Sequence, residues 1–375
     1  MERQGLTGAV RPGIVRRLAV LRAAALSCAP RLRTVLRAAA LSCAAVLAAA
    51  PLTAQTARPP VVILTTGGTI ASRSDAPMAS GDSLVGAVPA LLDHAQVTVE
   101  EFSRVGSSQI TPAHWLALAQ RINGLFSERP DLAGIVITHG TDTMDETAFF
   151  LNLTVRDERP VVITGSMRSA TEISADGPAN LLNAVRIAAA PHARGRGVLV
   201  ALNEDISAAR DVWKTDNRRV DTFASPELGH LGFVDPDTVV FLRATLKPHT
   251  TESELDVHDV EVLPTVLVAH DHTGFDPRDL QDLVARRPDG IVLATFAGGR
   301  TSPGAREGVR AAVAAGIPVA LASRVPGGRI VGDPAAPLGA VLAADLSPWK
   351  ARILLMLGLT RTRDTDGLRR IFARY

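Results

Sequence analysis

Short apolar runs alternate with amphipathic runs along this chain, and that alternation restricts the fold more than any other feature. The amphipathic run at residues 111–126 has Thr111 as a natural N-cap and Pro112 as a natural first helical residue. The apolar runs are short and rich in β-branched residues, which is typical of strands buried on both faces. They read "VVILTT" (61–66), "GIVITHG" (134–140), "PVVITGS" (160–166) and "GVLVALN" (197–203). We therefore predict an α/β fold whose mainly parallel sheet is flanked by helices.

A polar stretch interrupts this rhythm at residues 247–262 and predicts a linker. The alternation then resumes with "TVLVAH", "GIVLATF" and "PVALAS". A chain of 375 residues can bury more than one core. We therefore expect two α/β domains, at residues 58–246 and 263–375, of which the second is smaller.

Residues 1–57 differ in kind from the rest and are typical of an export signal. They carry eight arginines, one acid and the apolar run "AAALSCAAVLAAA", with small residues for cleavage near 54–57. The apolar run is short for a membrane span, so no membrane association is expected after cleavage. Both cysteines, Cys28 and Cys43, lie in this segment, so no disulfide is expected in the remainder. Without the segment the net charge falls from +2 to −5, which gives no reason to expect nucleic acid as a partner.

Side-chain hydroxyls gather where the predicted strands end. In open α/β sheets, ligands bind beyond the carboxyl ends of the strands. Gly67 and Gly68 permit backbone angles that other residues rarely adopt and would let a ligand approach closely, but no phosphate-binding glycine pattern surrounds them. A polar ligand smaller than a nucleotide is therefore expected. The hydroxyls belong to Thr66, Thr69, Ser107, Ser108, Thr111, Thr138, Thr141 and Thr143.

Lysine is scarce in this chain, which has 40 basic residues but only Lys214, Lys247 and Lys350 as lysines. An amine can lose its proton when burial and neighbours lower its pKa, whereas a guanidinium practically cannot. Lys214, in "ARDVWKTDNRR", is therefore a candidate base if the fold places it near Thr141 and Asp142. The alternative is a surface lysine that forms an ordinary ion pair.

Three histidines are candidate metal ligands. His139 lies in "THGTD", and His270 and His272 lie in "AHDHTG". A metal site needs three or four converging ligands, and neither stretch is joined by a second cluster. We expect structural or surface histidines, with no metal and no cofactor.

Two segments, "TTGGTIA" and "GIVITHGTDTMDETAFFL", resemble the signature segments of the bacterial L-asparaginases, more closely the exported (type II) asparaginases and glutaminase-asparaginases. The resemblance extends from about Val61 to Tyr375. It implies an amidohydrolase that converts L-asparagine to L-aspartate and ammonia through a threonine acyl-enzyme intermediate. It also implies a periplasmic or secreted homotetramer with sites between subunits, acting on a small amino-acid amide.

The resemblance also implies a role for each matching residue. Thr69 matches the nucleophile of the first segment, and Thr141 with Asp142 matches the pair of the second. Lys214 matches the catalytic lysine. Ser107 matches the serine that binds the substrate α-carboxylate, with Ser108 beside it, while Asp142 also receives the α-ammonium. Which threonine attacks first is not decided by the sequence.

The chain departs from the family pattern at three places. The segment after "TTGGTIA" has no tyrosine, since Tyr375 is the only one in the chain. The loop "ATFAGGRTSPG" lacks the asparagine, and no residue after Glu307 is a glutamate, although members of the family supply both to the substrate from a neighbouring subunit. Ser108 stands where a larger polar residue is common. Arg300 or Ser302 could compensate, and the choice among Asn, Gln and other amides stays open.

Two other functions remain as alternatives. Two exported α/β domains joined by a linker also describe a periplasmic amino-acid binding protein. A divergent member of the family would hydrolyse glutamine or another amide. A protein that only binds its ligand should tolerate Lys214→Arg, whereas an enzyme that uses this lysine as a base should not.

Overall fold

The computed structural model describes residues 57–68, 70 and 80–375, so the predicted leader lies outside the described residues except for Ala57. The strands of the larger sheet are β1 (Pro60–Gly67), β2 (Gln96–Val105), β3 (Gly134–Thr138), β4 (Val161–Thr164), β5 (Val198–Leu202), β6 (Asp205–Ala208), β9 (Gly232–Val234) and β10 (Val239–Phe241). Their order is β10-β9-β6-β5-β4-β3-β1-β2. Neighbouring strands from β2 to β5 are parallel, as predicted. At the other edge β6, β9 and β10 add antiparallel pairs.

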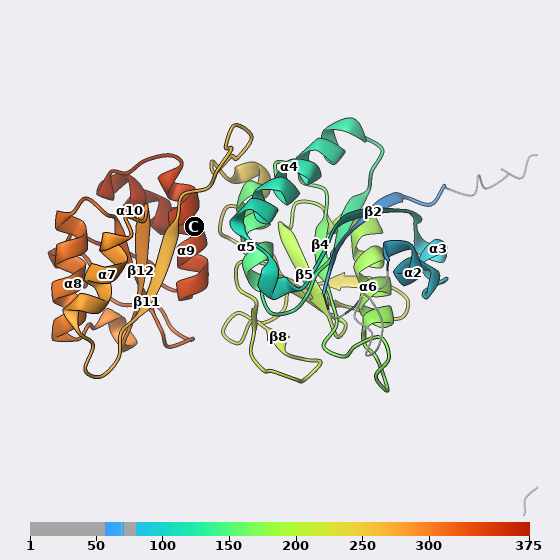
Figure 1. Cartoon of the computed structure of the whole chain (residues 1–375). Helices are drawn as coiled ribbons and strands as arrows, with labels where there is room; N and C mark the ends of the chain where they lie inside the picture. The colour runs from blue at the N-terminus through green and yellow to red at the C-terminus, as the bar shows by residue number, and fades with distance from the viewer. Residues whose placement is uncertain (1–56, 69, 71–79) are drawn as a thin grey trace, which may run out of the picture. The chain divides into compact units, whose positions relative to one another are not determined.

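Helices cover both faces of this sheet (Figure 1). On β1, Val62 and Leu64 share a core with α4 and α5, whereas Val61 and Ile63 share a core with α2, α3 and α6. Successive residues of a strand point to opposite faces, so a strand that is apolar at every position is buried on both. The helices are α2 (Gly81–Gly86), α3 (Leu91–His94), α4 (Pro112–Glu128), α5 (Met144–Thr154) and α6 (Gly177–Ala189), with short turns η2 (Ser107–Gln109) and η3 (Pro191–Ala193). Thr111 is the N-cap of α4, as predicted.

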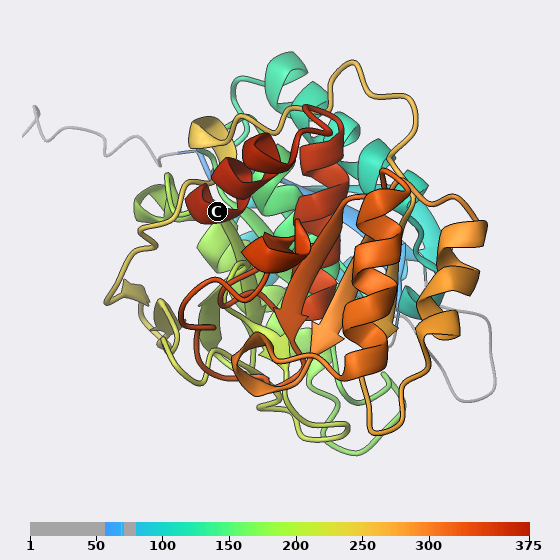
Figure 2. The same ribbon diagram turned by 90° about the vertical axis from the view of Figure 1, so that its left-hand side faces the viewer.

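The smaller domain is built on a second, fully parallel sheet of order β11-β12-β13-β14. Helices α7 and α8, in orange in Figures 1 and 2, pack on one face, and α9 and α10 pack on the other. The α/β prediction therefore holds for both sheets. The elements are β11 (Val266–His270), β12 (Gly290–Thr295), β13 (Val319–Ser323), β14 (Val341–Leu342), α7 (Pro277–Ala285), α8 (Pro303–Ala314), α9 (Pro348–Leu359) and α10 (Thr365–Arg374), with turns η5 (Ala297–Gly299) and η6 (Ala336–Leu338).

The predicted linker, residues 247–262, contains one short turn, η4 (Thr250–Glu252), and is partly built into the core. Leu255 and Val257 are buried, and Ser253 Oγ donates a hydrogen bond of 2.6 Å to the carbonyl of Leu153 in α5. One apolar cluster contains residues of both α5 and α9. Residues 58–375 accordingly form one compact unit, and the boundaries at 246 and 263 stay a prediction.

A separate two-stranded antiparallel sheet joins β7 (Trp213–Lys214) to β8 (Phe223–Ala224). Lys214 therefore lies outside both the eight-stranded sheet and the four-stranded sheet. In the part of the chain that the structure describes, no helix combines the length and the apolar character needed to cross a lipid bilayer.

Candidate active site

The two glycines after β1 bring this strand end against the turn that follows β3. Gly67 and Gly68 have φ angles of 105° and 84°, which residues with a side chain rarely adopt. A Cβ atom on Gly68 would lie 2.3 Å from the Cα and N atoms of Gly140. The predicted need for glycine at this turn is therefore confirmed. Gly68 and Gly140 directly precede Thr69 and Thr141, the two threonines of the predicted site.

Thr69 lies outside the described residues, so its side chain is not part of the geometry that follows. Four of the other predicted residues meet at the carboxyl ends of the parallel strands. They are Ser107, Thr141, Asp142 and Lys214. Ser108, the fifth, is exposed beside Ser107.

Ser107 is held in the turn η2 against the segment that follows β3. Its side chain is buried, and its Oγ accepts a hydrogen bond of 3.1 Å from the backbone N–H of Asp142. Its carbonyl accepts a hydrogen bond of 2.9 Å from Thr143 Oγ1. A Cβ atom on Gly140 would lie 2.7 Å from Ser107 Oγ. Glycine at 140 therefore allows the close approach of the two segments.

Lys214 reaches this cluster from β7. Its Nζ lies 3.0 Å from Thr141 Oγ1 and 2.9 Å from Asp142 Oδ1. The Thr141 side chain is buried, and that of Lys214 is 20% exposed, whereas that of Asp142 is 66% exposed. An amine, a hydroxyl and a carboxylate in direct contact can move a proton between them. Because most of the Asp142 side chain stays exposed beside this contact, its carboxylate can also meet a cationic group on a ligand.

His139 is a structural histidine, as predicted. It is fully buried, its Nδ1 lies 2.7 Å from the carbonyl of Gly140, and its Nε2 lies 3.0 Å from Thr147 Oγ1. Burial lowers the pKa of His139 to about 4, so the ring is neutral at pH 7. A carbonyl can only accept, so Nδ1 carries the proton and Thr147 donates to Nε2. The same Thr147 hydroxyl accepts a hydrogen bond of 2.8 Å from Trp115 Nε1.

Two carboxyl groups, those of Asp145 and Glu146, lie in the first turn of α5. Burial raises the pKa of Asp145, and the positive charges of Lys350 and Lys214 oppose that rise. Burial also raises the pKa of Glu146 to about 7, and the neighbouring Asp145 adds to the rise. Glu146 Oε2 lies 3.9 Å from Arg352 Nη1.

Glu146→Gln should flatten the dependence of stability on pH. The unfolded chain releases the proton of Glu146 near its ordinary pKa of 4.5, whereas the folded protein holds it to about 7. The stabilisation from this group is therefore complete below pH 4.5 and is lost as the pH rises toward 7. The free energy of unfolding of the wild type should fall over that window by about 2–3 kcal/mol more than that of the variant.

Urea unfolding at several pH values measures this difference. Glu128→Gln is the matched control, because Glu128 is a largely exposed glutamate on α4. Equal pH slopes for the wild type and Glu146→Gln would show that Glu146 does not retain its proton in the folded protein.

Among residues 57–68, 70 and 80–375, no three His, Cys, Asp or Glu side chains are grouped as metal ligands would be. His270 lies against the Trp349 ring, with 5.5 Å between ring centroids. His272 packs against Phe275 in the same way, at 5.3 Å.

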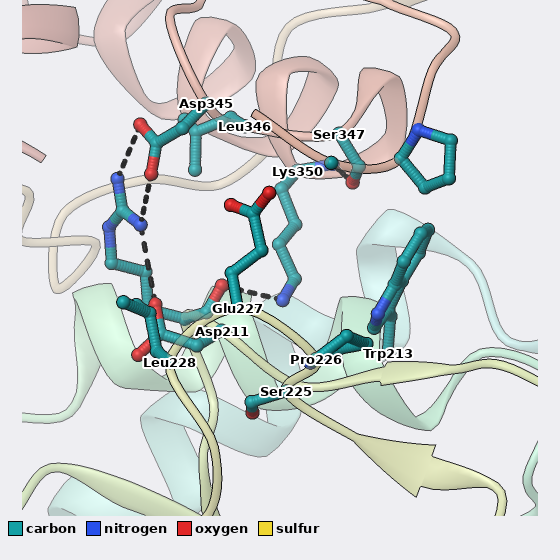
Figure 3. A pocket seen from close by; sticks show the side chains of 13 residues that line it. Asp211, Trp213, Ser225, Pro226, Glu227, Leu228, Asp345, Leu346, Ser347 and Lys350 are labelled. Carbon is teal, nitrogen blue, oxygen red and sulfur yellow. Dashed lines mark hydrogen bonds and ion pairs between the residues drawn. The ribbon is translucent and has the colours of Figure 1, made fainter. Parts of the chain in front are cut away.

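A cavity of about 340 Å³ lies beside β7, but none of the predicted site residues lines it. Its wall includes Arg210. It also includes Trp213, Glu227 and Lys350, which are labelled in Figure 3. Lys350, on α9, is buried beneath the segment that leads to Lys214. The scarcity of lysine was the one sequence signal that could have drawn attention to it.

Comparisons with known proteins cover nearly the whole described chain. Residues 60–247 match the family model described as "Asparaginase, N-terminal", and residues 265–372 match "Glutaminase/Asparaginase C-terminal domain". "L-asparaginase 2" of Bacillus subtilis is 40% identical over 84% of this chain and 87% of its own length. "Glutaminase-asparaginase" of Pseudomonas fluorescens is 37% identical over 84% of this chain and 90% of its own length.

A solved structure of an asparaginase has a fold similar to that of this chain. The crystal structure titled probable cytoplasmic L-asparaginase from Campylobacter jejuni matches with a TM-score of 0.81 and 39% sequence identity. The match covers 85% of this chain and 100% of that one.

Proposed function

The chain belongs to the asparaginase family, and on that premise we propose that it is an amide hydrolase that converts L-asparagine to L-aspartate and ammonia. The observation that carries the proposal is the position of Lys214 Nζ, 3.0 Å from Thr141 Oγ1 and 2.9 Å from Asp142 Oδ1. An amino-acid binding site needs a carboxylate and hydroxyls. It has no need for a lysine in contact with a buried threonine.

In the proposed reaction, the hydroxyl of Thr69 attacks the side-chain amide carbon of the substrate. A threonine hydroxyl is a weak nucleophile, so a base must remove its proton during the attack. Lys214, in its neutral form, takes that proton through the hydroxyl of Thr141, and Asp142 orients the amine. The proton then passes to the departing nitrogen, and ammonia leaves as the carbon–nitrogen bond breaks.

The product of this first step is an ester between Thr69 and the aspartyl group. Water then attacks the ester carbonyl, and the same amine removes one proton from the water. The carbon–oxygen bond to Thr69 breaks, the threonine regains a proton, and L-aspartate is released. Lys214 ends each cycle in its starting protonation state.

Ser107 and Asp142 are proposed to hold the charged ends of the substrate. Ser107 would bind the α-carboxylate, with Ser108 at the rim, and Asp142 would bind the α-ammonium. The hydrogen bond from the Asp142 N–H to Ser107 Oγ supports this pairing, because it fixes the distance between the two groups. The exposure of the Asp142 carboxylate leaves room for an incoming ammonium.

Ammonia release from a panel of amides tests the activity. The panel contains L-asparagine, L-glutamine, D-asparagine and short β-aspartyl amides, since the relatives are named both L-asparaginase and glutaminase-asparaginase. We expect the highest kcat/KM for L-asparagine. A higher value for glutamine would make the protein a divergent member of the family. Binding of asparagine without ammonia release would instead identify an amino-acid binding protein.

The Michaelis constant for L-asparagine should be higher than that of a relative with the complete partner set. The loop at residues 294–304 lacks an asparagine, and the chain has no glutamate after Glu307. Each hydrogen bond to a charged group contributes about 1.5–3 kcal/mol, so one uncompensated loss should raise the constant about tenfold. The control is a relative whose own sequence contains both of these residues, assayed in parallel. Equal constants would mean that other residues, such as Arg300 or Ser302, replace the missing partners.

Assembly and location belong to the same proposal. We propose a homotetramer with sites between subunits, which sedimentation velocity can measure. We also propose that residues 1–57 direct export to the periplasm or the medium. The arginine-rich and apolar composition of that segment supports export, as does the similarity to a Haemophilus influenzae protein named probable periplasmic L-asparaginase. Cell fractionation with N-terminal sequencing of the exported protein tests this.

A further inference from the structure

The proposed reaction uses one of the three lysines that this arginine-rich chain contains. A second, Lys350 on α9, is only 4% exposed. An ammonium is costly to bury unless hydrogen bonds and opposite charges compensate for the lost water. The groups around the Lys350 amine should therefore show which part of the structure this residue stabilises.

Lys350 binds the backbone just before β7. Its Nζ donates hydrogen bonds to the carbonyls of Arg210 and Val212, at 2.6 and 2.7 Å. It also lies 5.7 Å from the centroid of the Phe149 ring, a distance at which a cation is attracted to an aromatic face. Figure 3 shows the Lys350 side chain extending from its helix to this backbone segment.

Nearby carboxylates compensate in part for the burial of Lys350. Burial lowers the pKa of Lys350 to about 8, and the positive charge of Arg210 adds to that fall, whereas the negative charges of Asp145, Asp211 and Asp345 oppose it. Asp145 also interacts with the charge of Lys214. The charge of the Asp145 carboxyl group, at the start of α5, therefore interacts with the charges of both lysines.

The backbone that Lys350 holds leads directly to Lys214. Val212 is followed by Trp213 and Lys214, which form β7. This strand pairs with β8 and is not part of the eight-stranded sheet, so the large sheet does not fix its position. Arg210 is anchored in turn, because its guanidinium donates to both oxygens of Asp345, at 2.8 and 3.0 Å.

We propose that Lys350 is a positioning residue for Lys214: by holding the carbonyls of Arg210 and Val212, it places the Lys214 amine against Thr141 and Asp142. The inference rests on the proposed function of Lys214. The two hydrogen bonds to carbonyls also explain why this position is a lysine and not an arginine. An ammonium is compact and directs three N–H groups freely, whereas a guanidinium is larger and planar and suits a carboxylate better than two separate carbonyls.

Lys350→Met tests this, with Lys247→Met as the matched control. Lys247 Nζ also donates to two backbone carbonyls, those of Ala373 and Arg374, at 3.1 and 3.2 Å. Folding of each variant is checked by circular dichroism, and rates are expressed per folded protein. We expect kcat for L-asparagine to fall about 10- to 100-fold in Lys350→Met, with KM within about threefold of the wild type. Lys247→Met should match the wild type within about twofold.

Lys350→Arg provides a second variant in case Lys350→Met does not fold, because it keeps the positive charge. Its kcat should fall at least about tenfold with little change in KM. A folded Lys350→Met or Lys350→Arg variant with wild-type kcat would overturn the positioning role.

Lys214→Arg in the same assay separates the proposed role of Lys214 from the positioning role of Lys350. If it is inactive while the Lys350 variants are fully active, the function stands and the positioning role is wrong. If Lys214→Arg is itself fully active, Lys214 is not the base and the positioning role is wrong with it, whereas asparagine hydrolysis itself stands.

Discussion

Lys214→Arg is expected to abolish turnover while the protein remains folded. The amine contacts Thr141 Oγ1 and Asp142 Oδ1 at 3.0 and 2.9 Å, so it is in reach of the proton that the reaction must move. Arginine keeps the positive charge and the ion pair with Asp142, but its guanidinium cannot lose a proton under these conditions. General-base catalysis contributes about 10²- to 10⁴-fold to a rate, and we expect a loss of kcat in that range.

The control for this variant is Lys247→Arg, which makes the same change at a lysine outside the proposed site. It should keep wild-type kcat and KM. Ammonia release measures activity, and thermal unfolding measures the integrity of the fold. Near-normal kcat in a folded Lys214→Arg protein would remove this lysine from the mechanism.

Thr69→Ala should stop hydrolysis and leave substrate binding intact. Thr69 lies outside the described residues, so the prediction rests on the sequence match and on the chemistry. Alanine removes the oxygen that attacks the amide, whereas Ser107 and Asp142 still bind the charged ends of the substrate. A covalent route that has lost its nucleophile should slow by at least about 10³-fold.

Calorimetric titration of Thr69→Ala with L-asparagine should give a measurable Kd. We expect this Kd to be similar to the Kd of the wild type for the product L-aspartate. Thr265→Ala, an exposed threonine of the smaller domain, is the control and should be fully active. Ammonia release by Thr69→Ala at the wild-type rate would show that another residue is the nucleophile.

Sequence periodicity predicted the parallel part of the fold but not its antiparallel edge. Strands β1, β3, β4 and β5 are apolar at nearly every position and therefore stand out. Strand β6 has four residues and follows a turn in which Asn203 and Glu204 have φ angles of 52° and 69°. Such turns usually contain glycine. An Asn–Glu pair gives no comparable signal, and the hairpin was missed.

Most of the candidate site was predicted from the resemblance to the family, which supplied the roles of Ser107, Thr141 and Asp142. Gly68 was expected from its place after a strand, and Lys214 from the scarcity of lysine as well as from that resemblance. The scarcity of lysine also marks Lys350 but does not reveal its role, since its partners are backbone carbonyls that every residue carries. The raised pKa of Glu146 depends on burial at a domain contact, which no local pattern encodes.

The most direct test of the proposed mechanism is to trap the acyl-enzyme. The wild type is mixed with L-asparagine, quenched in acid within the first turnover, digested and analysed by mass spectrometry. We expect the added mass of one aspartyl group on the peptide that contains Thr69, and none on that peptide in Thr69→Ala. An aspartyl group on the peptide that contains Thr141, with the Thr69 peptide unmodified, would contradict the assignment of Thr69 as the nucleophile.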